Sequence, residues 1–197
     1  MNLRLINKLM IGVLAFGMVG TAAAATQEIN ATVTVSNTIT LAKNSDLSFG
    51  SISATFDDTA SSTVVAKMTV KADGSPSVVT ANTPASANII IIADGAPAEV
   101  AVSGAAPGQD LSVSVAETTV TMTDPSGVSA HTFSLQAFNF YYAENSNTFT
   151  TTTDGTGNLT IGIGADLVTT NPAGDSGVGI LYDDATYTGK FNLNVEY

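Results

Sequence analysis

The chain has 197 residues, no cysteine and no tryptophan, and 17 acidic side chains against 6 basic ones, for a formal net charge of −11. Without cysteine it has no disulfide, no thiol nucleophile, no iron–sulfur cluster and none of the usual structural zinc sites. Such an acidic surface repels nucleic acid and anionic lipid, so we exclude a nucleic-acid function.

The first 25 residues are typical of a cleaved export signal. Arg4 and Lys8 give a positive start, residues 9–19 are apolar, and the alanines at 22–25 offer a cleavage site. The apolar run is short for a membrane span. We therefore expect a secreted or cell-surface protein, exported through the periplasm, with no membrane span after cleavage. Residues 26–197 are expected to form a single domain, long enough to bury a core without disulfides.

An alternating comb of apolar and polar residues follows the signal. Alternation of this kind buries one face of a strand and wets the other, so it predicts strands at 30–35 and 39–43. The strand can complete the chain's own sheet, or it can be added to a sheet of a neighbouring subunit. The sequence leaves both arrangements open. The apolar positions of the comb are Ile29, Ala31, Val33, Val35, Ile39 and Leu41.

The rest of the chain consists of short alternating segments separated by turn signals such as Asp-Gly and Asp-Pro-Ser-Gly. No window shows an apolar period near that of a helix. This pattern predicts an all-β fold, an immunoglobulin-like or pilin-like antiparallel β-sandwich. Further strands are expected at 47–52, 63–72, 77–81, 88–93, 99–102, 111–115, 119–123, 132–142, 159–162 and 190–197.

Two segments depart from simple alternation. Residues 89–92 are four consecutive isoleucines, which suit a central strand covered on both faces better than an exposed edge. In the aromatic segment 132–142, Phe133 and Leu135 have the opposite parity to Phe138, Phe140 and Tyr142, which predicts a β-bulge near Ala137. We expect this segment to form the core; the alternative is a sugar-stacking aromatic patch.

Residues suited to catalysis are scarce. His131 is the one histidine, and neither a nucleophile motif nor a phosphate-binding loop occurs. Adjacent acids stand at Asp57-Asp58 and Asp183-Asp184; a loop calcium site is possible there, but solvated turns are favoured because no EF-hand spacing is present. We expect no enzyme activity, no catalytic residue, no metal and no cofactor.

Two motifs resemble a known family. Residues 47–52 read LSFGSI and residues 187–197 read YTGKFNLNVEY. They are similar to the opening and closing motifs of a family of exported bacterial β-sandwich domains of unknown function, and the resemblance extends from about residue 30 to the end. The closing segment is also similar, more distantly, to the ends of chaperone–usher and spore-coat-U-like pilins. That resemblance implies a last strand beside a groove that receives a neighbour's N-terminal strand.

Together these features predict a non-enzymatic fimbrial or surface-fibre subunit, with a role in cell adhesion, that assembles by β-strand addition. Its expected partners are identical subunits or an export chaperone, and residues 26–41 are the possible donor strand. Because the chain offers more strands than the roughly seven to nine of an immunoglobulin-like sandwich, it can also fill its own groove. The alternatives are a monomeric carbohydrate- or surface-binding module and a calcium-stabilised accessory domain. The predicted partner-strand residues are Ile29, Ala31, Val33, Val35, Phe191, Leu193 and Val195.

Overall fold

The alternating segments form antiparallel strands in the computed structural model, and no helix occurs in the described residues. The structure describes residues 30–33, 38–56, 65–81, 87–129, 131–141, 147–170 and 180–197. The expected export signal lies outside them. Ser36–Tyr197 is one compact unit, and Met1–Val35 is a separate one. The strands are β1 (Thr40–Ser45), β2 (Ser51–Phe56), β3 (Ala66–Val70), β4 (Val78–Ala81), β5 (Asn88–Ala93), β6 (Ala98–Ser103), β7 (Asp110–Val115), β8 (Thr119–Met122), β9 (Phe133–Phe140), β10 (Thr148–Thr152), β11 (Leu159–Thr169), β12 (Ile180–Leu181) and β13 (Leu193–Glu196).

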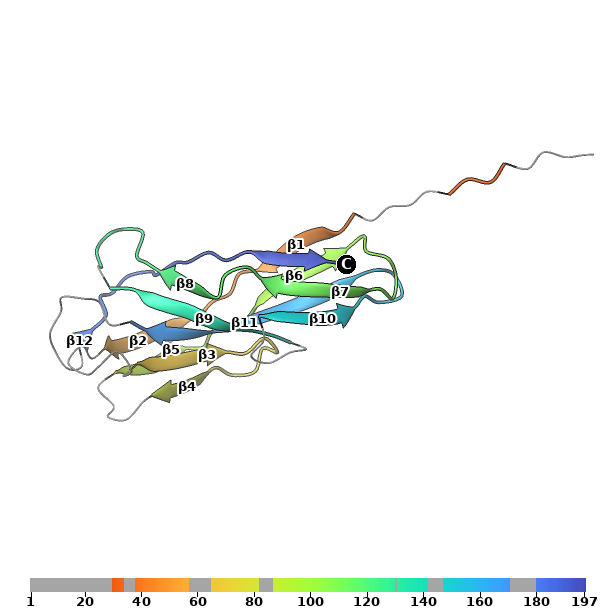
Figure 1. The fold of residues 1–197 in the computed structure, drawn as a ribbon. Coiled ribbons are helices and arrows are strands. Elements are labelled where there is room, and N and C mark those ends of the chain that lie inside the picture. Colours follow the sequence, from red (N-terminus) through yellow and green to blue (C-terminus); the bar gives the residue numbers. More distant parts are fainter. Residues whose placement is uncertain are drawn as a thin grey trace, which may run out of the picture. The chain divides into compact units, whose positions relative to one another are not determined.

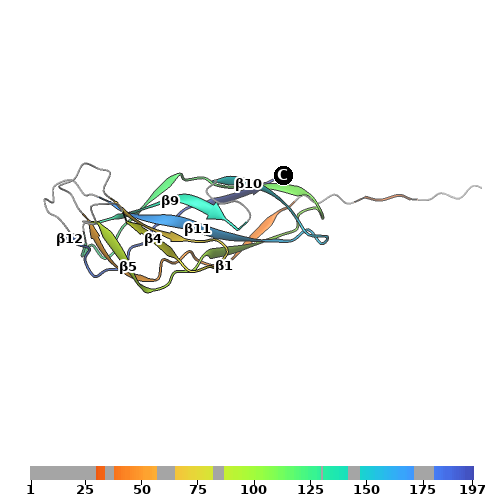
Figure 2. The same cartoon turned by 90° about the horizontal axis from the view of Figure 1, so that it is seen from below.

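The strands make three antiparallel sheets, so the predicted all-β sandwich is confirmed. The largest sheet runs β1-β6-β11-β3-β4, with β9 also paired to β11 and β8 to β9. The two smaller sheets run β10-β7-β13 and β12-β2-β5. Both views place the long strand β11 and its partner β9 in the middle of the unit (Figures 1 and 2). Strand β11 pairs with β6 along its first half and with β3 and β9 along its second.

One core joins the three sheets. Ile89 of β5, Phe138 of β9 and Leu111 of β7 are each at most 2% exposed and belong to one hydrophobic cluster, although they lie in different sheets. Each such side chain stabilises the fold by about 1.5–3 kcal/mol relative to an exposed one. The expectation that segment 132–142 forms the core is confirmed for its buried phenylalanines, whereas Tyr142 lies outside the described residues.

The predicted bulge is present at Ala137. Its φ is 49°, the one positive value among the non-glycine residues that the structure describes. Gly164 pairs with Asn139 and Asp166 with Gln136, so Ala137 and Phe138 together lie opposite one residue of β11. The extra residue changes the strand's parity, as the sequence indicated.

The prediction for the isoleucine run was wrong. Strand β5 ends the β12-β2-β5 sheet and is covered on one face only. Ile89 is buried, but Ile90 is 57% exposed and Ile92 is 71% exposed. A run of apolar residues has no period, so it does not reveal whether a second layer covers the outer face.

Other strand limits also differ from the prediction. Residues 30–33 are exposed and belong to no strand, so the strand expected at 30–35 was wrong for these residues. Strands β10 and β12 were not expected, and β11 continues well beyond residue 162. Gly162 and Gly164 both lie within β11. A Cβ on Gly162 would stand 2.4 Å from the Ala72 carbonyl oxygen, and a Cβ on Gly164 would stand 2.1 Å from that of Val70.

Candidate partner-strand groove

A groove of about 780 Å³ runs between β1 and the C-terminal segment 187–193. Each side is the last strand of its sheet: β1 ends the largest sheet, and β13, which continues this segment, ends the β10-β7-β13 sheet. Figure 1 shows the two strands at the same margin of the unit, close to the C-terminus. The edge strands of two different sheets therefore border one groove. Its lining consists of Leu41, Lys43, Ser45, Asp46, Leu47, Phe49, Ala98, Val100, Met122, Leu135, Ile163, Tyr187, Thr188, Gly189, Lys190, Phe191, Asn192 and Leu193.

Strand β1 forms the first wall. It pairs with β6, Leu41 opposite Val102 and Lys43 opposite Val100, which places its odd-numbered side chains on the inner face. Leu41 is nevertheless 41% exposed, and every residue of β1 is exposed. A strand with a free edge presents unpaired backbone N–H and C=O groups that can pair with another strand.

The C-terminal segment forms the second wall. Phe191, Leu193 and Val195 alternate with exposed polar residues and pack against the core while staying partly exposed. The ring of Phe191 lies 4.8 Å from that of Phe138. On its other side the segment pairs with β7, Leu193 opposite Val115. Its apolar residues therefore face the interior beside the groove, as their alternation predicted.

Polar contacts hold this wall in place. The Glu117 carboxylate accepts hydrogen bonds from the Asn192 backbone N–H at 2.8 Å and from its side-chain amide at 2.6 Å. These bonds, that of the backbone N–H first, lower the pKa of Glu117. At the chain end the Tyr197 hydroxyl accepts a hydrogen bond from the Ala106 backbone N–H at 3.1 Å. The closing strand is therefore anchored at both ends.

Gly189 allows the wall to pass close to β8. A Cβ at this position would stand 2.9 Å from a methyl carbon of Val120 and 3.0 Å from Met122 Cγ. Thr188 next to it bridges to Thr123 through two backbone hydrogen bonds of 2.8 and 2.9 Å. The missing side chain of Gly189 thus leaves the space that side chains of β8 occupy.

The floor of the groove comes from strands that lie far apart in the sequence. Ala98 of β6, Leu135 of β9 and Ile163 of β11 are at most 5% exposed and line its base. Sequence reasoning missed them, because alternation shows that a strand has a buried face but not which cleft that face lines.

The structure brings together only part of the predicted set. Phe191 and Leu193 line the groove with Leu41, and Val195 continues their face. Ala31 and Val33 are exposed, Val33 at 86%. Ile29 and Val35 lie outside the described residues.

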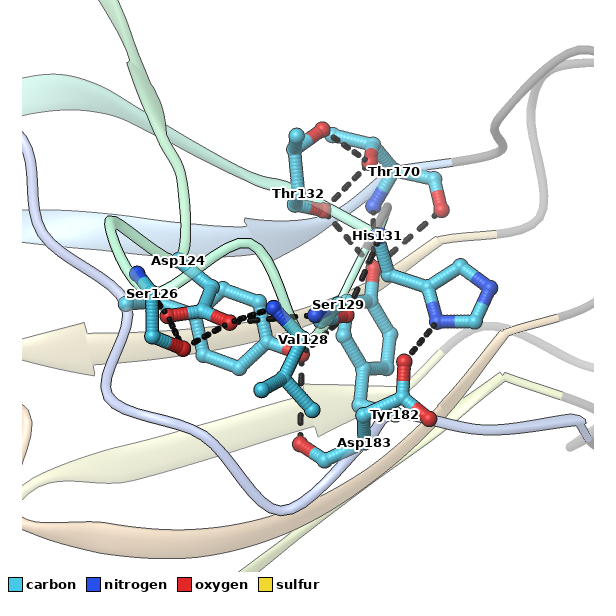
Figure 3. Close-up of polar contacts among 10 residues, drawn as sticks. Asp124, Ser126, Val128, Ser129, His131, Thr132, Thr170, Tyr182 and Asp183 are labelled. Atoms are coloured by element: carbon cyan, nitrogen blue, oxygen red, sulfur yellow. Dashed lines mark hydrogen bonds and ion pairs between the residues drawn. The ribbon is translucent and has the colours of Figure 1, made fainter.

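Outside the groove, polar residues around Asp124 and His131 connect neighbouring loops through hydrogen bonds and an ion pair (Figure 3). Asp124 is 8% exposed and accepts hydrogen bonds from the Ser126 hydroxyl and backbone and from the backbones of Val128 and Ser129. These bonds, the Ser126 hydroxyl first, lower the pKa of Asp124 to about 2. Because all of these donors lie within five residues of Asp124, the carboxylate fixes the shape of its own turn.

His131 lies in the same region, among aromatic rings. Its Nδ1 is 3.3 Å from an Asp183 carboxylate oxygen, and its ring is 4.8 Å from that of Phe56. Burial raises the pKa of the neighbouring Tyr182 to about 12, and the Tyr182 hydroxyl donates to the Thr132 carbonyl at 3.0 Å. These contacts join the loop before β9 to the segment after β12.

The described residues contain no group of three or more histidine, aspartate or glutamate side chains placed to hold a metal ion. Asp57 and Asp58 fall outside them. Within the same part of the chain, no helix is long and apolar enough to cross a membrane.

Both motifs noted in the sequence meet at this groove. Leu47 and Phe49 belong to the first motif, Tyr187 and Phe191 to the second, and all four line the cleft. Residues 39–197 match a family model described as a domain of unknown function, DUF4402. The chain belongs to this family. No curated protein and no solved structure matches the chain. The DUF4402 match contains both walls of the groove and begins after the comb residues 29–35.

Proposed function

We propose that this DUF4402 protein is an exported, non-enzymatic structural subunit of a surface fibre, assembled by adding a β-strand into the groove. The observation that carries the proposal is the groove itself, which opens between the edge strands of two sheets and leaves apolar side chains of both walls partly exposed. An added strand would hydrogen-bond to a free sheet edge through its main chain, and its alternating side chains would set the register.

The apolar character of the walls supports this function. Leu41, Phe191 and Leu193 line the groove while remaining partly exposed. An incoming apolar residue that covered them would remove more apolar surface from water. This burial would stabilise the complex by about 25 cal/mol for each Å². A strand with apolar residues at every second position fits this role, because it presents one apolar face to the cleft.

Export is the second part of the proposal and rests on the first 25 residues. The positive start, the apolar run and the alanines are those of a secretion signal. A subunit that reaches the cell surface and exposes free sheet edges is suited to fibre formation.

The test compares the mature protein with a variant that lacks residues 26–36, a deletion that leaves β1 and both walls intact. We expect the mature protein to form filaments or heat-resistant oligomers in electron microscopy and gel analysis, and the variant to remain monomeric. Substitution of Thr32 and Thr34 by serine, on the polar face of the comb, is the matched control and should assemble normally. Mature protein that stays monomeric in light scattering would contradict the proposal, and measurable glycan affinity of that monomer would favour a carbohydrate-binding module instead.

A further inference from the structure

The short connection between comb residues 29–35 and β1 restricts which strand can fill the groove. Residues 36–38 separate Val35 from Ile39, which packs against the core just before β1. A parallel neighbour in the same chain needs a crossover of a dozen residues or more. If the comb paired with its own β1, the two would therefore have to form an antiparallel hairpin.

The commonest type of hairpin, with a two-residue loop, would place the apolar side chains of residues 29–35 on the face away from the groove. A two-residue loop at 36–37 would place Val33 opposite Thr40 and Ala31 opposite Ala42. Residues directly opposite in an antiparallel pair share a face. Thr40 and Ala42 alternate with Leu41 and Lys43, which line the groove. The apolar residues of the comb would therefore point to solvent.

A three-residue loop would place these apolar side chains on the groove face, but it requires either an unfavourable backbone conformation or the loss of one apolar comb residue. Such loops normally end in a residue with left-handed backbone. A loop at 36–38 requires this of Thr38, whose φ is not positive in the structure and whose branched side chain disfavours it. Its carbonyl oxygen also lies 2.5 Å from where a Cβ on Gly104 would stand, so the chain is already beside Gly104 at this point. A loop at 35–37 can use Asn37, but it removes Val35 from the comb.

A second copy avoids these restrictions. Its residues 29–35 would enter the groove without a hairpin loop, and all four apolar residues could face inward. At about 3.3 Å per residue the comb spans roughly 20 Å, close to the length of β1. The comb carries no charge, and the charged residues that line the groove are Lys43, Asp46 and Lys190, of which Lys43 and Asp46 form an ion pair at 2.5 Å. An uncharged donor strand therefore adds no repulsion between two acidic subunits.

We infer that the occupant of the groove is the comb, residues 29–35, of a second copy of this chain, and not the chain's own comb. The inference rests on the proposed strand addition and names its donor. It also separates the alternating region into two roles: residues 29–35 are donated, whereas Ile39 and Leu41 belong to the accepting subunit.

The absence of cysteine allows a direct test by disulfide trapping. The acceptor lacks residues 26–36 and carries Leu193→Cys; the donor is the full mature chain with one cysteine at position 29, 31, 33 or 35. Donors with Thr32→Cys or Thr34→Cys, on the opposite face, are matched controls. We expect at least one odd-numbered donor to form a disulfide with the acceptor under mild oxidation, identified by its mass, and the even-numbered controls to form little.

A second arm separates this inference from the function on which it rests. A full-length chain with both cysteines, Val33→Cys and Leu193→Cys, is oxidised at high dilution. A disulfide within that chain, with none between copies, would overturn the inference, because the groove would then hold the chain's own comb. Filaments formed by this oxidised chain would leave the surface-fibre function in place. If no odd-numbered donor is trapped in either arm, the comb is not the strand that fills the groove. Trapping of odd and even positions alike would show random contact and would also refute the inference.

Discussion

Val33 offers the sharpest test of the comb as a binding strand. Its side chain is 86% exposed, so almost all of its apolar surface remains to be buried. Complete burial of a valine is worth about 1.5–3 kcal/mol. Since 1.4 kcal/mol corresponds to a tenfold change in Kd, removal of this contact alone should weaken binding by roughly 10- to 150-fold. Val33→Asp should exceed this range, because it also forces a carboxylate into an apolar cleft.

The assay is fluorescence anisotropy with a labelled peptide of residues 27–37 and the subunit that lacks residues 26–36. Thr34→Asp is the matched control, since it adds the same charge one residue away, on the face that remains in water. Strong weakening by Val33→Asp and little change from Thr34→Asp is the expected result. Equal loss in both peptides would show that charge alone controls binding, and the reasoning from alternation would be refuted.

Three further predictions concern stability, measured by urea denaturation. Gly164→Ala should lower the free energy of unfolding by about 1–3 kcal/mol, because the added Cβ would stand 2.1 Å from the Val70 carbonyl oxygen; an unchanged midpoint would contradict this. Ala137→Gly should raise it by up to about 1 kcal/mol, because glycine adopts the observed φ of 49° without strain. Asp124→Asn should flatten the pH dependence between about pH 4 and 2. The folded pKa of Asp124 lies below its ordinary value, so its contribution is present above pH 4 and lost as pH falls toward 2.

The alternation of the sequence was sufficient to predict most strands. It located β7 and β13 within a few residues, because each has a half-buried face that repeats every second residue, and the run of isoleucines located β5 without any alternation. It missed β10, whose sequence TFTTT contains one large apolar residue. It also ended β11 too early, because glycines such as Gly162 and Gly164 are typical of turns, whereas here they leave room for the backbone of Val70 and Ala72 to pass close to β11.

The groove was predictable only in part. Phe191 and Leu193 could be assigned to one face from their spacing, and that face now lines the cleft. That β1 would stand across from them depends on the pairing of β1 with β6 and of β6 with β11, over long stretches of chain. Local pattern contains no information on such pairings, since register along a sheet is set by the whole core.

Gly50 shows why the first motif belongs to the groove. Its φ is 70°, and a Cβ there would lie 2.1 Å from the Ala93 carbonyl oxygen, so only glycine fits. This turn lets the chain leave β1 of the largest sheet and enter β2 of another, with Phe49 buried and Leu47 on the groove wall. The closing motif uses Gly189 in a similar way to carry Phe191 along the opposite wall. Two segments from opposite ends of the domain thus use a glycine each to bring apolar residues to the same opening. A domain that only buried its own core would not need a groove at this place. The arrangement of the two motifs therefore favours a groove that receives an added strand.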